Sequence, residues 1–285
     1  MIFLVPYFQV QPHPPSPFCP SPFCPSSFCP SSFVPALLSL PFCPSSLVPA
    51  LLSLPFCPSF LVTLDTLAIM TPDLPILAGA TVRLEPLELC HASGLAGASA
   101  ADPALYAWSP VPQGIDAARA YIETALAARN GGTALPFATV RIADGAVLGS
   151  TRFFEVDRWK WPAGHPQHGR KTPDVCEIGY TWLTASALRT AANTEAKLLM
   201  LSHAFESWQV HRVCLHTDAR NLRSRAAIER IGGKFEGVLR AHRMAADFIP
   251  RDSCRYSIIA AEWPEVKQRL TQRLRPATPP RSNES

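Results

Sequence analysis

Apolar and polar residues follow a regular pattern only from about Thr81 onward. Runs with an apolar residue at every second position predict strands, and apolar residues three and four positions apart predict helices. The predicted strands cover residues 81–86, 137–142, 147–156, 175–183, 212–217, 234–239 and 254–261. The predicted helices cover residues 88–100, 116–129, 195–208, 222–231 and 263–274. The pattern therefore predicts one folded domain of ordinary size, preceded by an appendage.

Turn and cap residues mark several of these boundaries. Asp144-Gly145 lies between two predicted strands and tolerates the positive φ of a hairpin turn. Asn221 can cap the helix at 222–231, and Gly232-Gly233 ends it. Residues 157–174 are rich in Pro, Gly, His and basic residues, which predicts a long exposed loop.

The first 69 residues have a different character. They repeat SPFCP-like units, contain no Lys or Arg, and have Asp65 as their one acidic residue. A signal peptide would need a positive start, and Pro49, Pro55 and Pro58 interrupt the apolar stretch that resembles a membrane span. We expect residues 1–69 to be a low-complexity segment, either disordered or upstream of a true start at Met70. Residues 70–275 are then the domain, and residues 276–285 a disordered tail.

Composition narrows the function classes. The formal net charge is +4, which permits an anionic ligand without demanding nucleic acid or a membrane surface. No CxxC pair occurs among the nine cysteines, and His165 and His168 lie in the loop without carboxylate partners, so we expect no metal site. The scattered cysteines of the domain favour reduced thiols and a cytoplasmic protein.

Residues capable of chemistry gather in three stretches. The strand CEIGYTWL (176–183) leads through LRTAANTEA (188–196) into a helix, and the N–H groups at a helix start can hold an anion. The second stretch, TDARNLRSRAAIERIGGKFEG (217–237), runs from a strand end through a helix. The third, RDSCRYSI (251–258), precedes EWPEVK.

Together these stretches resemble the GNAT family of acetyl-CoA-dependent N-acetyltransferases, in its RimJ/RimL-type branch, from about Thr81 to Trp263. The resemblance implies an α/β (α+β) GNAT fold. In that fold a central mixed, mostly antiparallel, twisted sheet is flanked by helices, and two splayed strands form the acetyl-CoA cleft.

The resemblance also implies a coenzyme site. Arg189, Ala192 and Thr194 stand at the positions of the family pattern Q/R-x-x-G-x-G/A, with Ala and Thr in place of the usual glycines. Asn221 and Ser224 match the N-x-x-S that opens the helix after the fifth strand. The side chain of Ala192 is only a methyl group, so it leaves room for the phosphates to approach the backbone. The expected cofactor-binding residues are Ile178, Gly179, Tyr180, Thr181, Trp182, Leu183, Arg189, Thr190, Ala191, Ala192, Asn193, Thr194, Asn221 and Arg225.

The reaction needs a group that removes a proton from the amine, because amines are mostly protonated near pH 7. Glu177 is the candidate base, since a carboxylate among apolar neighbours is suited to accept a proton near neutrality. A structural Glu bonded to a neighbouring strand is the alternative. Ser224 is the candidate that assists the departing thiolate, with a solvent-facing hydroxyl as the alternative.

Fewer residues indicate where the acceptor amine binds. Tyr106 and Trp108 could line an acceptor pocket or pack beneath their loop, and Arg251 is a candidate substrate-binding residue. Phe248 stands where relatives have Gly, which puts the hairpin before the last strand in doubt. Arg220, Arg223, Arg225 and Arg230 look like a nucleic-acid patch, but a role toward coenzyme A explains them more simply.

The expected function is acetyl transfer from acetyl-CoA to a primary amine, which is a protein N-terminus or a small molecule, by direct attack in a ternary complex. The expected partners are acetyl-CoA and an amine acceptor, with no metal, nucleic acid or membrane, and a homodimer is left open. The alternative is a GNAT-like sensor that binds acyl-CoA without turnover, and a nucleic-acid binder is a distant third.

Overall fold

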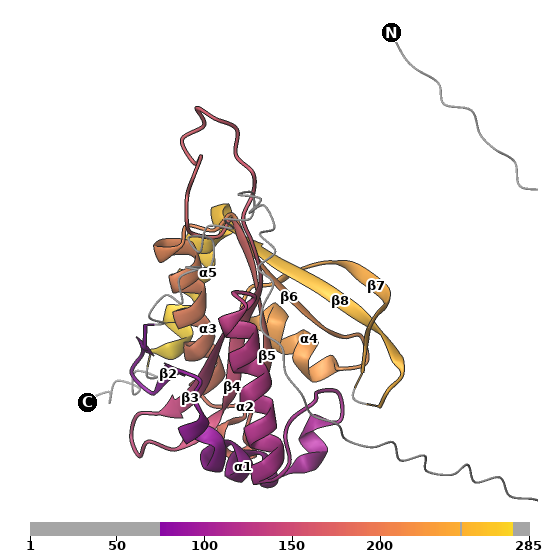
Figure 1. Ribbon diagram of the computed structural model, residues 1–285. Coiled ribbons are helices and arrows are strands. Elements are labelled where there is room, and N and C mark those ends of the chain that lie inside the picture. The colour runs from indigo at the N-terminus through magenta and orange to yellow at the C-terminus, as the bar shows by residue number, and fades with distance from the viewer. Residues whose placement is uncertain (1–74, 246, 276–285) are drawn as a thin grey trace, which may run out of the picture. The chain divides into compact units, whose positions relative to one another are not determined.

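The structure is a computed structural model that describes residues 75–245 and 247–275, so the predictions for residues 1–74 and 276–285 lie outside it. One eight-stranded sheet runs in the order β1-β2-β3-β4-β5-β6-β8-β7 (Figure 1). Every neighbouring pair is antiparallel except β5 and β6. The strands are β1 (Leu77–Ala78), β2 (Val82–Pro86), β3 (Ala134–Arg141), β4 (Val147–Asp157), β5 (Val175–Leu183), β6 (Arg212–Asp218), β7 (Lys234–Met244) and β8 (Pro250–Ile259). The predicted mixed, mostly antiparallel sheet flanked by helices is confirmed.

Helices cover the sheet in two groups (Figure 1). α1 (Ala92–Ala100) and α2 (Ile115–Asn130) share one hydrophobic core, in which Leu95 and Ile122 are fully buried. α3 (Ala192–Ser202), α4 (Leu222–Arg230) and α5 (Trp263–Leu274) share the other, with Met200 and Leu270 at its centre. Successive residues of each strand point to opposite faces, so each strand contributes side chains to both layers.

Short helical turns complete the chain. They are Leu89–His91, Pro103–Tyr106, Ala185–Ala187 and Ala260–Glu262, together with the π-helical turn His203–Ser207 that continues α3. No regular element occurs between β4 and β5, as the loop prediction for residues 157–174 requires. No helix in residues 75–245 or 247–275 has the length and apolarity needed to span a membrane.

The predicted elements all occur, but several bounds differ. β3 begins three residues before its predicted start, and the helix predicted from residue 88 begins with the short turn Leu89–His91. The helix predicted from residue 195 begins at Ala192 and ends in the π turn. The strands predicted at 234–239 and 254–261 form a longer hairpin, because β7 runs to Met244 and β8 starts at Pro250. β1 was not predicted, since two residues are too few to show any alternation.

The sheet splits between β5 and β6. These parallel strands pair only where Val175–Glu177 meet Arg212–Cys214, although both strands continue beyond that point. On the other side of β5 the register to β4 shifts between Arg152↔Gly179 and Ser150↔Trp182. That shift is a β-bulge at Tyr180 and Thr181, where Tyr180 takes a positive φ of 51°. The split leaves main-chain groups of β5 and β6 without partners in the sheet, which is the feature the splayed-strand prediction required.

Candidate active site

Glu177 lies at the point where β5 and β6 part. It is opposite Cys214 in the last pair of the parallel ladder, and its side chain is only 2% exposed. Its Oε1 contacts Nδ1 of His216, two residues further along β6 and therefore on the same face of the sheet. Beyond that contact, neither carboxylate oxygen has a hydrogen-bond partner among the described residues. A buried carboxylate with spare acceptor capacity can receive a proton.

His216 was missing from the predicted site. In β6, Val213 and Leu215 lie in the hydrophobic core, so the alternate residues Cys214 and His216 point to the other face. The sequence signal was a histidine at an alternate position of an otherwise apolar strand. Its contact with Glu177 depends on how β5 pairs with β6, which the sequence of one strand does not reveal.

Aromatic side chains line the approach to this pair. Phe154 of β4 is opposite Glu177, and its ring centroid lies 6.1 Å from that of His216. The Tyr180 ring lies edge-on to Phe154 at 5.1 Å, and Tyr180 is 45% exposed. The guanidinium of Arg152 lies 4.0 Å from the centre of the Tyr180 ring. We call the side of the sheet that carries these residues the Glu177 face.

The hairpin of β7 and β8 adds basic groups to the Glu177 face. The His242 ring lies 5.2 Å from His216, and burial lowers the pKa of His242, helped by the charges of His216 and Arg243. On β8, Arg255 is opposite His216, so Arg251, four residues earlier, points to the same side. Arg251 is half-buried, and burial lowers its pKa below that of a solvated guanidinium. The predicted substrate-binding residue Arg251 and the predicted base therefore share one face.

The predicted pyrophosphate loop forms the start of α3. No side chain caps this helix at Ala191, and the Ala192 N–H donates to Thr190 Oγ1 at 3.2 Å. The N–H groups of Asn193 and Thr194 fall in the first turn, where a helix supplies no acceptor. The Ala192 methyl, expected to leave room for phosphates, instead packs in the core. Ala191 is the exposed small side chain at this helix start.

At the start of α4 the structure supports the capping assignment. Asn221 Oδ1 accepts a hydrogen bond from the Ser224 N–H at 3.0 Å, which leaves the Asn221 amide NH₂ free for a ligand. Arg225 Nε donates to the Tyr256 hydroxyl at 3.2 Å. Arg220 pairs with Asp218 and Asp247, so part of the basic patch around α4 already has acidic partners.

Tyr106 and Trp108 differ in their surroundings. The Tyr106 ring packs edge-on against Trp182, and its hydroxyl donates to the Leu183 carbonyl at 3.1 Å. Of the two interpretations for Tyr106, the structure favours packing. Trp108 is only partly buried, and the Arg220 guanidinium lies 4.2 Å from its ring centre.

Phe248 keeps the backbone geometry that a glycine would provide. Its φ is 60°, its N–H donates to the Ala245 carbonyl, and its side chain is 82% exposed. The turn between β7 and β8 thus forms despite the departure from the family pattern, at the cost of a left-handed conformation in a non-glycine residue.

The opposite face of the sheet holds a buried cation. Lys197 of α3 donates to Thr181 Oγ1 at 2.6 Å and to Thr151 Oγ1 at 3.0 Å, beneath the bulge of β5. Burial lowers its pKa to about 7. The lysine was not predicted, because it occupies a helix position that reads as polar and exposed.

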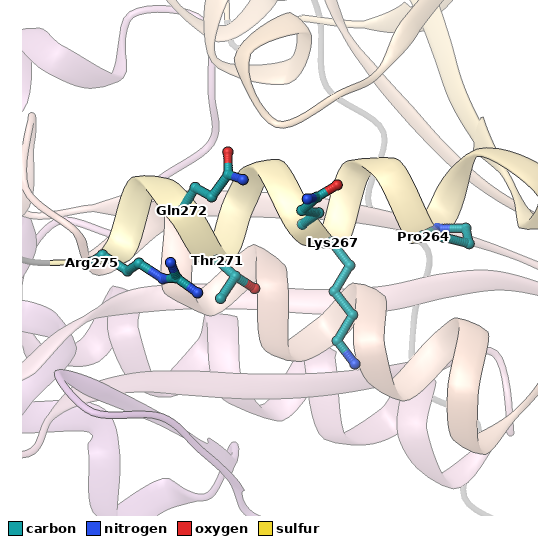
Figure 2. A pocket seen from close by; sticks show the side chains of 6 residues that line it. Pro264, Lys267, Thr271, Gln272 and Arg275 are labelled. Carbon is teal, nitrogen blue, oxygen red and sulfur yellow. The ribbon is translucent and has the colours of Figure 1, made fainter.

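Neither a metal site nor the hollow along α5 adds to the candidate site. Within the described ranges, no group of three or more His, Cys, Asp or Glu side chains is arranged to hold a metal ion. An open hollow lies along α5 (Figure 2), and none of the candidate site residues lines it. Its lining residues are Pro264, Lys267, Gln268, Thr271, Gln272 and Arg275.

Comparison with known proteins agrees with this geometry. Residues 81–234 match the family model described as acetyltransferase (GNAT) domain. The chain is similar to a GCN5-related N-acetyltransferase from Brucella melitensis, with 28% identity over 73% of this chain and 88% of that one and a TM-score of 0.62. A structure from T. thermophilus described as an acetyltransferase is 34% identical over 71% and 98% of the two chains, with a TM-score of 0.57. A search of curated proteins found no match.

The RimJ/RimL resemblance is also supported at the level of the fold. Mycobacterium smegmatis RimJ, solved in complex with CoA-disulfide, is 24% identical over 70% of this chain and 91% of that one, with a TM-score of 0.56. The chain belongs to the GNAT acetyltransferase family, and the prediction of an acetyl-CoA-dependent N-acetyltransferase is confirmed.

Proposed function

We propose that the protein transfers the acetyl group of acetyl-CoA to a primary amine by direct attack in a ternary complex, with Glu177 as the general base. The observation that carries this proposal is the position of Glu177, buried at the point where β5 and β6 part, with His216 as the polar contact of its carboxylate among the described residues. The acceptor is a protein N-terminus or a small-molecule amine.

The proposed reaction moves one proton from the amine to Glu177 and another to the departing sulfur. The amine nitrogen gives its proton to Glu177, directly or through water, and its lone pair attacks the thioester carbonyl carbon. The C–S bond then breaks as the carbonyl re-forms, and the sulfur leaves with the electron pair. The attacking nitrogen loses its second proton, which reaches the sulfur with the Ser224 hydroxyl as the candidate relay, giving one proton to the sulfur and taking up the other from the nitrogen. His216 holds the Glu177 carboxylate in place through its Nδ1 contact.

Main-chain groups of β5 are the proposed partners of the thioester end. Beyond Glu177, β5 no longer pairs with β6, so N–H groups in the stretch Gly179 to Trp182 can reach an oxygen that gains negative charge. The same edge can bond the amides of the pantetheine arm, which extends to Asn221. The pyrophosphate is proposed to lie against residues 189–194, where the helix dipole and first-turn N–H groups favour an anion.

Ala191 offers a sharp test of the coenzyme site. In Ala191→Glu the added negative charge would repel the pyrophosphate, whereas an acidic residue at a helix start does not weaken the helix. We expect the KM for acetyl-CoA to rise about tenfold or more relative to Ala191→Gln, the size-matched neutral control. Acetyl transfer is followed by release of the coenzyme A thiol with a panel of amines. Equal KM values in the two variants would remove this loop from the site, and no thiol release with any amine would overturn the proposed transfer.

A further inference from the structure

Two arginines on the Glu177 face have no acidic partner. Arg152 is 5% exposed, and its Nε is buried without a hydrogen-bond partner among the described residues. The same holds for Nε of Arg251. Within residues 75–245 and 247–275, none of the ion pairs includes either arginine.

This arrangement is unusual because a buried charge is normally paired. Removing a guanidinium from water costs free energy, and this cost is normally offset by a paired carboxylate and by hydrogen bonds. Other arginines near this face follow the rule, since Arg243 pairs with Glu155 and Arg212 with Glu236. Arg255 of the same face has no acidic partner either, but its guanidinium donates to Cys214 Sγ. Among the described residues, Arg152 and Arg251 are thus the arginines of this face with neither an ion pair nor a hydrogen bond.

Aromatic contacts hold Arg152 in place. Its guanidinium carbon lies 4.0 Å from the Tyr180 ring centre and 5.2 Å from that of Tyr121. Rings can stabilise the faces of a guanidinium, but they leave its N–H edges without acceptors. Those edges have the fork geometry that binds a carboxylate with two parallel hydrogen bonds.

Both arginines lie close to the proposed point of attack. Tyr180, which contacts Arg152, is linked through Phe154 to the Glu177–His216 pair. On the hairpin, Arg251 is opposite Arg243, whose guanidinium lies 5.8 Å from the Phe154 ring centre. A ligand whose amine meets Glu177 would thus place its neighbouring groups beside these guanidiniums.

We infer that the acceptor is an amine that carries a carboxylate close to its amino group, and that Arg152 and Arg251 bind this carboxylate. The inference rests on the proposed function, because it uses Glu177 as the group that meets the amine. Two sources have this chemistry: a free amino acid, with its α-carboxylate, and a peptide with an acidic side chain next to its N-terminus.

The experiment compares matched acceptors. Free amino acids are compared with their amides, and peptides with Asp or Glu at the second position are compared with the Asn or Gln versions. We expect kcat/KM to be about 10- to 100-fold higher for the acid of a pair, the range expected for hydrogen bonds to charged groups. The pair that shows the larger ratio identifies the source of the carboxylate.

Substitutions of the two arginines then test whether they cause the preference for the acid. Arg251→Gln should lose most of the preference for the acid, measured as the ratio of kcat/KM for the acid to kcat/KM for the amide. The exposed Arg240, replaced by Gln, is the control and should keep the preference. Arg152→Gln should act like Arg251→Gln, and if its melting temperature shows that it does not fold, Arg251→Gln alone decides.

Three outcomes overturn the inference. Acids and amides that react equally well would remove the carboxylate from recognition while leaving acetyl transfer intact. A preference that persists in Arg251→Gln and in folded Arg152→Gln would place the carboxylate elsewhere. A panel in which no amine is acetylated would contradict the proposed function itself, and the inference would fall with it.

Discussion

Two buried glutamates of this protein have opposite surroundings. Glu195, in the first turn of α3, accepts hydrogen bonds from the backbone N–H groups of Ala80, Thr81 and Val82 at 2.7, 2.7 and 2.8 Å. Glu177, at the split of the sheet, contacts His216 and has no other polar partner for its carboxylate in residues 75–245 and 247–275. They are similarly buried, at 6% and 2% exposure, so burial alone does not separate them.

The difference concerns the hydrogen bonds that each carboxylate accepts, and it separates Glu195 from the proposed base Glu177. Burial raises the pKa of Glu195, but the three N–H donors outweigh it and leave this pKa below its ordinary value. It accepts three hydrogen bonds, and these link α3 to the start of β2. No such donor faces Glu177 among the described residues, so its oxygens remain available to a ligand proton.

The largest expected effect comes from Glu177→Gln. The substitution keeps shape and hydrogen-bonding atoms but removes basicity, so kcat should fall by roughly 10²–10⁴, and the acidic limb of the pH–rate profile should move or vanish. Steady-state rates across pH and a melting temperature measure this. The KM for acetyl-CoA should stay near its original value. A structural Glu177 would instead lower the melting temperature and leave kcat and the pH profile unchanged.

Glu195→Ala should have the reverse signature. Three N–H groups would lose their acceptor, and that of Val82 is buried, so the free energy of unfolding should fall by about 1–3 kcal/mol. Denaturant unfolding measures this loss. Folded protein should keep its kcat within about threefold, because Glu195 touches no proposed reacting group. A large fall in kcat with unchanged stability would break the comparison between the two glutamates.

The stability that Glu195 contributes should depend on pH. A carboxylate whose folded pKa is depressed stabilises the fold above its unfolded pKa, and this contribution is lost as pH falls through the folded pKa. The difference in melting temperature between the original protein and Glu195→Gln should therefore be constant from pH 7 to about 5. It should shrink below the ordinary value of 4.5. A difference that stays the same down to pH 3 would contradict the ionised state of Glu195.

The smallest effect is expected at Lys197, whose folded pKa of about 7 lies below its ordinary 10.5. Between these values the unfolded chain binds a proton that the folded chain lacks, so the original protein gains stability as pH rises. Lys197→Met should be at least as stable near pH 7, because Thr151 and Thr181 already bond to each other at 2.8 Å. Its advantage should shrink by pH 10. Melting temperatures at both pH values test this, and a variant that is less stable only near pH 7 would contradict it.

The sequence predicted most of the fold because its strongest signals are local. The bounds of β5 and α5 agree with the predicted ranges, and Asn221 caps α4 as its side-chain chemistry indicates. The end of β7 was missed, since a positive φ at Ala241 and a register shift before Arg243 interrupt the alternation there.

Contacts between distant segments could not be predicted in the same way. Glu195 reads as an ordinary first-turn acid, and its three donors come from residues more than 110 positions away. The His216 contact likewise requires the pairing of two strands that are joined by a helix. Candidate residues were found by type and position, but their partners were not.

The short pairing of β5 with β6 also bears on how the family can diverge. Three residue pairs join one half of the sheet to the other, and the remaining edges present main-chain groups rather than side chains. A ligand that lies along these edges forms the rungs that the sheet lacks, in the manner of an added strand. Because every amino acid except proline offers the same amide and carbonyl, substitutions along the edge leave such recognition intact. If acetyl-CoA binds there, as proposed, side chains that contact the acceptor can change while the main-chain groups that bind the donor substrate stay the same.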